Sequence, residues 1–160
     1  MMLITWALAL LGLGKALSFS LNRVALREKI SCKAALVELA PGEFDNEVTK
    51  ESEVVIVDFY ADWCGPCKLM GPIFKQLAEE LPADGLKFVK VDTDVHESTV
   101  ESYNIQGLPL FGVFIDGKMI SSHSGALSKV NLRQFIIKSL LEHSVENKSE
   151  KVAKLIDSIS

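Results

Sequence analysis

Residues 54–68 read Val54-Val55-Ile56-Val57-Asp58-Phe59-Tyr60-Ala61-Asp62-Trp63-Cys64-Gly65-Pro66-Cys67-Lys68, an apolar β-forming run that ends in two cysteines separated by glycine and proline. If a helix begins at the cysteines, Cys64 lies at the positive end of the helix dipole, which stabilises a thiolate and lowers its pKa. Cys67 follows one turn later, within reach of a disulfide with Cys64. The stretch therefore predicts thiol–disulfide exchange.

Half of a structural zinc site is the alternative interpretation of the two cysteines. Zinc needs four ligands, usually two cysteine pairs or one pair with spaced histidines. The remaining candidates form no second pair at ligand spacing; they are Cys32, His96, His123 and His143. We expect a redox pair and no metal, with inert packing of the cysteines as the third possibility. The histidines stand apart along the chain, so we expect them at the surface and assign them no chemistry.

The composition limits the classes of function. The chain has 160 residues, a net charge of −4 and 48% apolar residues, which suits one domain with a sizeable core. Residues 1–35 are strongly basic, so the remainder is more acidic than the total suggests. Such an acidic body carries no electrostatic footprint for nucleic acid. Three cysteines are also too few for the disulfide framework of a small secreted protein.

Residues 1–35 are predicted to be a cleavable targeting presequence, signal-like over 1–18 and transit-like over 19–35. The apolar block 3–13 has the length of a signal peptide and is too short to span a bilayer comfortably, although no Lys or Arg precedes it. Small residues permit cleavage before Phe19. The basic stretch that follows resembles the second part of algal presequences that reach plastids through the secretory route. We therefore favour a plastid, with secretion, the ER or a short membrane anchor as alternatives.

The rest of the chain alternates strand and helix patterns. Strands are predicted over 34–39, 54–60, 86–91, 110–115 and 118–123, and helices over 43–50, 68–81, 96–103 and 128–141. Asp116-Gly117 is a type I′ turn pattern, so the last two strands should form a hairpin. Pro72 should kink its helix, and Ser128 should be an N-cap. These patterns indicate an α/β fold, a mixed sheet with helices on both faces.

Residues 58–68 resemble the active-site motif of the thioredoxin family. The resemblance continues in the proline-containing helix, in Lys90, in Gly107-Leu108-Pro109 and in Gly125-Ala126-Leu127-Ser128-Lys129. It covers residues 36–143 and implies the thioredoxin fold with dithiol-dependent reduction of protein disulfides. Residues 144–160 form a polar or amphipathic extension, either one or two extra helical turns or a frayed tail.

The resemblance assigns roles to the catalytic residues. Cys64 would attack the substrate disulfide and Cys67 would resolve the mixed disulfide. Asp58 interrupts an apolar strand, so burial should raise its pKa, and it would accept the proton of Cys67. Lys90 would support Asp58 through water or, alternatively, lie solvated at the surface. Gly65-Pro66 between the cysteines is typical of reductants in this family.

Further residues are implied in substrate docking. Pro109 would be the family's cis-proline, with the backbone of Leu108 turned toward an extended substrate. Trp63, with Gly125 and Ala126, would complete an apolar surface around Cys64, although Trp63 also fits a core position. Leu110 stands where most thioredoxins have Thr, which affects the expected substrate preference.

Three functions compete for this pattern. The first is a protein-disulfide reductase of cell redox homeostasis, a monomer without cofactor that a ferredoxin- or NADPH-dependent thioredoxin reductase recharges. The second is an oxidative foldase of the secretory pathway, which Gly65-Pro66 disfavours. The third is a binding module without turnover, which the retention of both cysteines and Asp58 disfavours.

Overall fold

The computed structural model describes residues 34, 36–48, 54–81 and 85–159. The predicted presequence, including its cleavage site and Cys32, lies outside the described residues apart from Ala34. Residues 144–159 belong to the same compact unit as the sheet.

The centre of the fold is a five-stranded mixed sheet. Its strands are β1 (Leu36–Glu38), β2 (Val54–Tyr60), β3 (Leu86–Asp92), β4 (Leu110–Ile115) and β5 (Lys118–Ser124), in the order β1-β3-β2-β4-β5. Strand β3 is parallel to β1 and β2, whereas β4 is antiparallel to β2 and β5. All seven residues of β2 are buried, as the continuous apolar run predicted for a strand covered on both faces.

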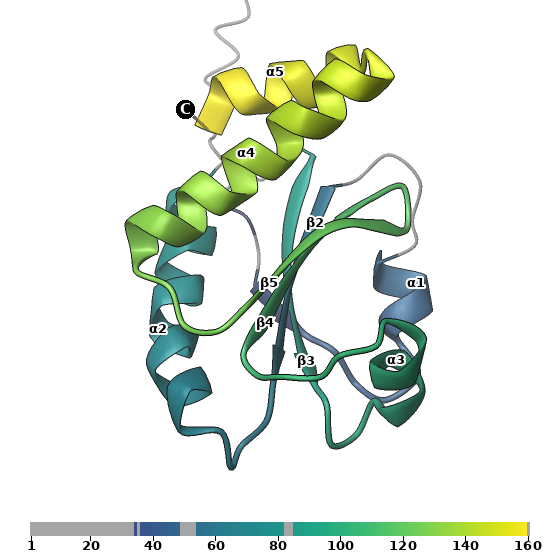
Figure 1. The fold of residues 1–160 in the computed structure, drawn as a ribbon, viewed down its shortest axis with the longest axis vertical. Helices are drawn as coiled ribbons and strands as arrows, with labels where there is room; N and C mark the ends of the chain where they lie inside the picture. The colour runs from purple at the N-terminus through teal and green to yellow at the C-terminus, as the bar shows by residue number, and fades with distance from the viewer. Residues whose placement is uncertain (1–33, 35, 49–53, 82–84, 160) are drawn as a thin grey trace, which may run out of the picture. The chain divides into compact units, whose positions relative to one another are not determined.

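Helices cover both faces of the sheet (Figure 1). They are α1 (Phe44–Val48), α2 (Gly65–Glu80), α3 (Glu97–Ser102), α4 (Lys129–Asn147) and α5 (Glu150–Ile159). Helices α2, α4 and α5 contribute to the apolar cluster on one face, which includes Phe74, Phe88 and Phe111. Helix α1 contributes Phe44 and Val48 to the cluster on the other face. The mixed sheet with helices on both faces confirms the predicted fold class.

Several local predictions hold in the structure. Asp116 and Gly117 both have positive φ, as the type I′ turn requires, and they join β4 to β5 as a hairpin. The hydroxyl of Ser128 accepts a hydrogen bond from the backbone N–H of Asn131, so Ser128 caps α4. Pro72 lies inside α2; a kink there stays a prediction.

Two predicted helix boundaries were wrong. Helix α2 begins at Gly65 rather than Lys68, because Pro66 fits the first turn, where its missing N–H costs no helical bond. Helix α4 continues past residue 141 to Asn147 and so crosses the predicted domain limit at 143. It ends at Lys148, which adopts the left-handed conformation typical of a helix end.

The C-terminal extension is a folded part of the core. Helix α5 packs beside α4 (Figure 1) and buries Val152, Leu155, Ile156 and Ile159 in the same apolar cluster as α2. The Arg133 guanidinium donates a hydrogen bond to the carbonyl oxygen of Ile159 at 2.6 Å. The extension is therefore the ordered amphipathic helix and not the frayed tail.

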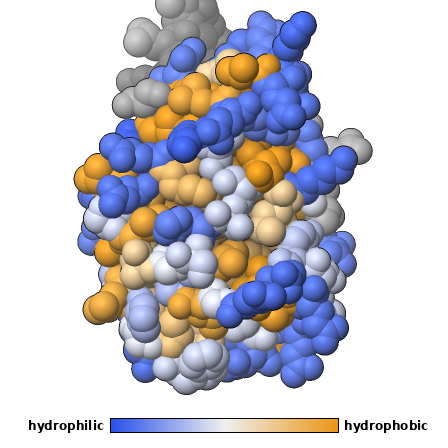
Figure 2. Space-filling model, in the orientation of Figure 1, coloured by the Kyte–Doolittle hydropathy of each residue, from blue (hydrophilic) through white to orange (hydrophobic). Residues whose placement is uncertain are grey.

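Apolar side chains also reach the surface. Figure 2 shows apolar atoms in the upper part of the molecule, where Figure 1 places α4 and α5. Val145 of α4 is an exposed apolar side chain. Within the described residues, no helix combines the length and apolar character that crossing a bilayer requires.

Candidate active site

The two cysteines of the motif form a disulfide at the start of α2. Cys64 is the N-cap residue of the helix, and Cys67 lies in its first turn. The backbone N–H of Cys67 donates a hydrogen bond to the sulfur of Cys64 at 3.2 Å. A free N–H at a helix N-terminus favours negative charge, so this geometry stabilises a thiolate on Cys64 when the disulfide is reduced.

Exposure does not distinguish the two cysteines in this oxidised state. Each residue is 5% exposed, so Cys64 is as deeply buried as Cys67. Tyr60 and Ala61 pack around the disulfide, with Leu108 against them. The difference between the two sulfurs is therefore their position on the helix, since Cys64 alone accepts the N-terminal N–H.

Asp58 is buried in the middle of β2, as the apolar strand predicted. Its side chain lies on the sheet face that α2 covers, the same face as Val54 and Ile56. Neither carboxyl oxygen has a hydrogen-bond partner among the described residues. Desolvation raises the pKa of Asp58 from its ordinary value of 3.8 to about 7, although the nearby charge of Lys90 lowers it in part.

Asp58 is the inner member of a charged row that crosses three strands. Lys90 of β3 pairs in register with Asp58 on one side and with Glu38 of β1 on the other. The ammonium of Lys90 lies 3.6 Å from a Glu38 carboxylate oxygen and 3.7 Å from the centre of the Tyr60 ring. The Tyr60 hydroxyl donates to the other oxygen of Glu38 at 2.5 Å, and this bond is the main cause of the lowered pKa of Glu38.

Glu38 and Tyr60 therefore hold the ammonium of Lys90. The side chain of Lys90 is 20% exposed, so it is not a fully solvated lysine. Its support of Asp58 through water stays a prediction. Burial and the bond to Glu38 raise the pKa of the Tyr60 hydroxyl, which keeps it a hydrogen-bond donor at neutral pH.

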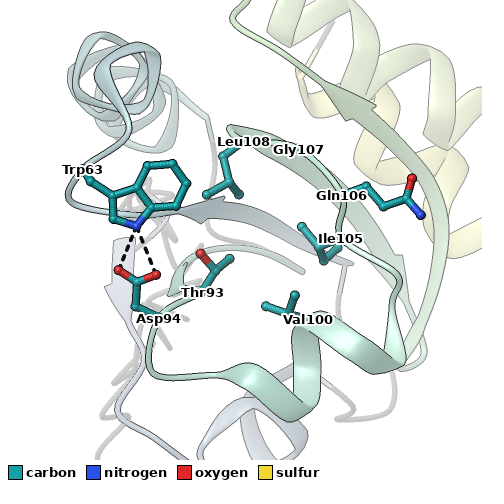
Figure 3. Close-up of a pocket in the computed structure, with 8 residues that line it drawn as sticks. All are labelled: Trp63, Thr93, Asp94, Val100, Ile105, Gln106, Gly107 and Leu108. Atoms are coloured by element: carbon teal, nitrogen blue, oxygen red, sulfur yellow. Dashed lines mark hydrogen bonds between the residues drawn. The ribbon is translucent and has the colours of Figure 1, made fainter.

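Trp63 lies at the surface beside the disulfide, with 71% of its area exposed, so it does not occupy the core position that its size allowed. Its indole N–H donates to both oxygens of the Asp94 carboxylate, at 3.0 and 3.2 Å. Together they form the rim of a pocket of about 300 Å³ (Figure 3). Its lining includes Trp63, Asp94, Val100, Ile105, Gly107 and Leu108.

The loops that carry the other predicted docking residues meet next to this pocket. The Leu108–Pro109 peptide bond is cis. The carbonyl oxygen of Pro109 accepts a hydrogen bond from the N–H of Gly125 at 2.8 Å. Gly125 has a φ of 102°, which a side chain would oppose, and Ala126 beside it is exposed. The fold thus joins Pro109 and Gly125, which are distant in sequence.

Four residues near the site were missed or misread from the sequence. Glu38 and Tyr60 contact the ammonium of Lys90, and Asp94 accepts the hydrogen bond of the Trp63 indole. The ring of His96 contacts the carbonyl oxygen of Asp92, in the turn that carries Asp94. His96 is 4% exposed, so the prediction of a surface histidine was wrong for it. Asp94 had a usable signal, because it lies three residues after the carboxyl end of a predicted strand, where binding residues of α/β sheets gather. No local pattern marks His96.

Metal ligands do not converge in the part of the chain that the structure describes. No three His, Cys, Asp or Glu side chains there are grouped so that they could hold an ion.

Comparisons with known proteins agree with this geometry. The Thioredoxin family model matches residues 35–138, which is more than half of the chain. The chain belongs to the thioredoxin family. A thioredoxin of Acidithiobacillus ferridurans is 39% identical over 102 residues, covering 64% of this chain and 94% of that protein. Chloroplastic thioredoxin Y2 of Arabidopsis thaliana is 42% identical over 97 residues, covering 61% of this chain and 58% of that protein.

A solved structure gives the same result. The reduced thioredoxin pre-protein of Schistosoma mansoni superposes with a TM-score of 0.59 at 37% identity, covering 66% of this chain and 98% of that one. This thioredoxin is accordingly a thiol–disulfide oxidoreductase that acts on disulfide-containing substrates through Cys64 and Cys67. The family match ends before α5, which is therefore an addition outside the matched region.

Proposed function

We propose that this thioredoxin is a protein-disulfide reductase of cell redox homeostasis, with Cys64 as its nucleophile. The observation that carries the proposal is the position of Cys64 as N-cap of α2, with the Cys67 N–H directed at its sulfur. A thiolate is the attacking species in disulfide exchange, and this N–H and the helix dipole both favour it.

The first step forms a mixed disulfide. The Cys64 thiolate attacks one sulfur of a client disulfide, the client S–S bond breaks, and the other client sulfur leaves as a thiolate. In the second step, Cys67 gives its proton to Asp58 and attacks the sulfur of Cys64. The Cys64–Cys67 disulfide forms, the second client sulfur leaves, and the client has gained two electrons.

Asp58 is suited to accept that proton. A carboxyl with a pKa of about 7 is a stronger base than an ordinary aspartate and is ionised in part at neutral pH. Lys90 is the supporting residue. Its positive charge lowers the pKa of Asp58 against the larger effect of burial and so favours the ionised carboxylate that accepts the proton. Neither oxygen of the Asp58 carboxyl accepts a hydrogen bond from a described residue, so both are available to a proton donor.

Gly65 and Pro66 set the direction of exchange in this proposal. Thioredoxin pairs have reduction potentials near −270 mV, against about −180 mV for protein disulfide isomerase, a gap of roughly 4 kcal/mol for two electrons. We infer the reducing direction from Gly-Pro between the cysteines. The oxidative foldase would require a potential near the second value.

The client docks on the surface around the disulfide. Trp63 and Leu108, which line the pocket, would provide apolar contact to the client, together with Gly125 and Ala126. Pro109 would place the backbone of Leu108 beside the extended client chain. We further propose that the protein acts as a monomer and uses no cofactor.

We place the protein in a plastid, reached by means of the cleavable presequence 1–35. The chloroplastic thioredoxins of Arabidopsis thaliana among its relatives support this location. A thioredoxin reductase, ferredoxin-dependent or NADPH-dependent, would restore the dithiol. A fluorescent fusion to residues 1–35 tests the location, and a signal in the ER would favour the secretory alternative.

Insulin reduction tests the activity. The full chain should reduce insulin with dithiothreitol as electron source, and Cys64→Ser should abolish this catalysis. Cys67→Ser should instead accumulate a mixed disulfide through Cys64, because the resolving thiol is missing. If Cys64→Ser retained the wild-type rate, Cys64 would not be the nucleophile.

A further inference from the structure

His96 joins two loops that are far apart in the sequence. Its ring is buried, with Nδ1 2.9 Å from the carbonyl oxygen of Asp92 and Nε2 3.1 Å from the carbonyl oxygen of Ala40. Carbonyl oxygens only accept, so each ring nitrogen that carries a proton donates to one of them. The ring thus lies within hydrogen-bond distance of both the turn after β3 and the loop between β1 and α1.

The turn that His96 holds carries one wall of the pocket. The Asp92 carboxylate accepts a hydrogen bond from the backbone N–H of Asp94 at 3.0 Å. Asp94 in turn holds the indole N–H of Trp63 (Figure 3). An unbroken series of contacts therefore runs from the His96 ring through Asp92 and Asp94 to Trp63, beside Cys64.

A second wall of the pocket also begins at His96. The carbonyl oxygen of His96 accepts hydrogen bonds from the N–H groups of Thr99 and Val100, both at 3.0 Å, and these start helix α3. Val100 then faces the pocket with Ile105 (Figure 3). The position of Val100 therefore depends on the position of His96, which contacts the loop between β1 and α1.

We propose that His96 is a positioning residue for client binding, which sets the distance between the Trp63–Asp94 rim and the α3 wall of the pocket. The inference rests on the proposed function, because it assumes that clients dock beside Cys64 at this pocket. His96 itself does not line the pocket, so it acts through Asp94 and Val100 and not by touching the client.

The test compares two substrates and three variants of the full chain. His96→Leu removes both contacts of the ring, and His96→Gln keeps one amide donor. His143→Leu is the matched control on α4, where the histidine ring contacts the Asn147 side chain one turn further along the same helix. Each variant is assayed with insulin and with a small aromatic disulfide, dithiobis(nitrobenzoate), which needs little docking surface.

We expect His96→Leu to raise KM for insulin by about 2- to 10-fold, the factor that corresponds to one lost hydrogen bond, with a much smaller change in kcat. The rate with the small disulfide should change far less. His96→Gln should fall between wild type and His96→Leu, and His143→Leu should match wild type. A merely structural histidine predicts instead parallel losses with both substrates, or none.

The indole N–H of Trp63 provides a readout that needs no activity. The chain has two tryptophans, so a Trp6→Phe background leaves a single indole signal in the NMR spectrum. His96→Leu should move that signal in the direction that Asp94→Ala moves it. An unmoved signal with unchanged KM for insulin would overturn the inference. If the wild-type chain failed to reduce insulin, the proposed function would fall, and the indole signal would still decide whether His96 positions Trp63.

Discussion

Asp58 and Lys90 occupy paired positions on neighbouring parallel strands, yet the ammonium of Lys90 lies against Glu38 and the Tyr60 ring. The buried carboxyl therefore has a cation on the next strand without a hydrogen bond from any described residue. Burial outweighs the attraction of that cation, which is why the pKa of Asp58 rises to about 7 and not below its ordinary value. The protonation of one interior group thus changes near neutral pH.

The raised pKa of Asp58 predicts that the oxidised protein loses stability as pH rises. Between the ordinary pKa of 3.8 and the folded-state value of about 7, the native protein keeps a proton that the unfolded chain releases. The contribution of Asp58 to the free energy of unfolding is therefore complete at low pH and is lost as the pH rises through this window. The total loss is about 4 kcal/mol. Asp58→Asn, which cannot ionise, should remove this slope and be more stable than wild type above neutral pH.

Urea unfolding of both proteins at about pH 4 and about pH 8 checks this prediction. Equal pH dependence of the two unfolding midpoints would show that Asp58 does not carry the buried proton.

Removing the charge of Lys90 should move the pH profile of catalysis. Lys90 lowers the pKa of Asp58, so Lys90→Met should raise it further and shift the acid limb of insulin reduction to higher pH. Lys87→Met is the matched control, since Lys87 lies on the same strand, faces the opposite side of the sheet and pairs with Glu47. If both variants gave the wild-type profile, Lys90 would have no influence on the proton acceptor.

Helix α5 should contribute directly to stability. Ile159 is 1% exposed within the apolar cluster of α2 and α4, so Ile159→Ala should lower the free energy of unfolding by about 2–4 kcal/mol. The hydrogen bond from Arg133 goes to the backbone of residue 159 and does not depend on its side chain. Val145→Ala is the control, because that side chain is 79% exposed and its loss should cost less than about 0.5 kcal/mol.

Guanidinium unfolding at fixed pH distinguishes these two variants. Equal midpoints for Ile159→Ala and Val145→Ala would mean that α5 does not pack on the core in solution.

The sequence predicted what depends on local pattern. The apolar run 54–60 indicated a central strand. Asp116-Gly117 indicated the type of turn between the last two strands, and the spacing of Cys64 and Cys67 indicated that they can form a disulfide. Contacts between distant segments were out of reach, because no short-range pattern records them. Lys90 was expected near Asp58, but Glu38 and Tyr60 hold its ammonium only because β1 pairs with β3 in this register.

His96 and the C-terminal helix illustrate the same limit. A lone histidine in a polar stretch has the pattern of a surface residue, and only the approach of Ala40 to Asp92 buries it. The apolar spacing of residues 152–159 indicated an amphipathic helix, but its partner face on α4 becomes visible only when the chain is folded.

Alkylation of the reduced protein tests the central claim, that the position of Cys64 at the start of α2 makes its sulfur the nucleophile. The protein is treated with iodoacetamide over a series from about pH 5 to about pH 9, and labelling of each cysteine is followed by mass spectrometry of peptides. We predict that Cys64 is labelled first and reacts well below about pH 8.5, the ordinary pKa of a thiol, while Cys67 lags. Equal, slow labelling of both cysteines until that pH, or faster labelling of Cys67, would contradict the account.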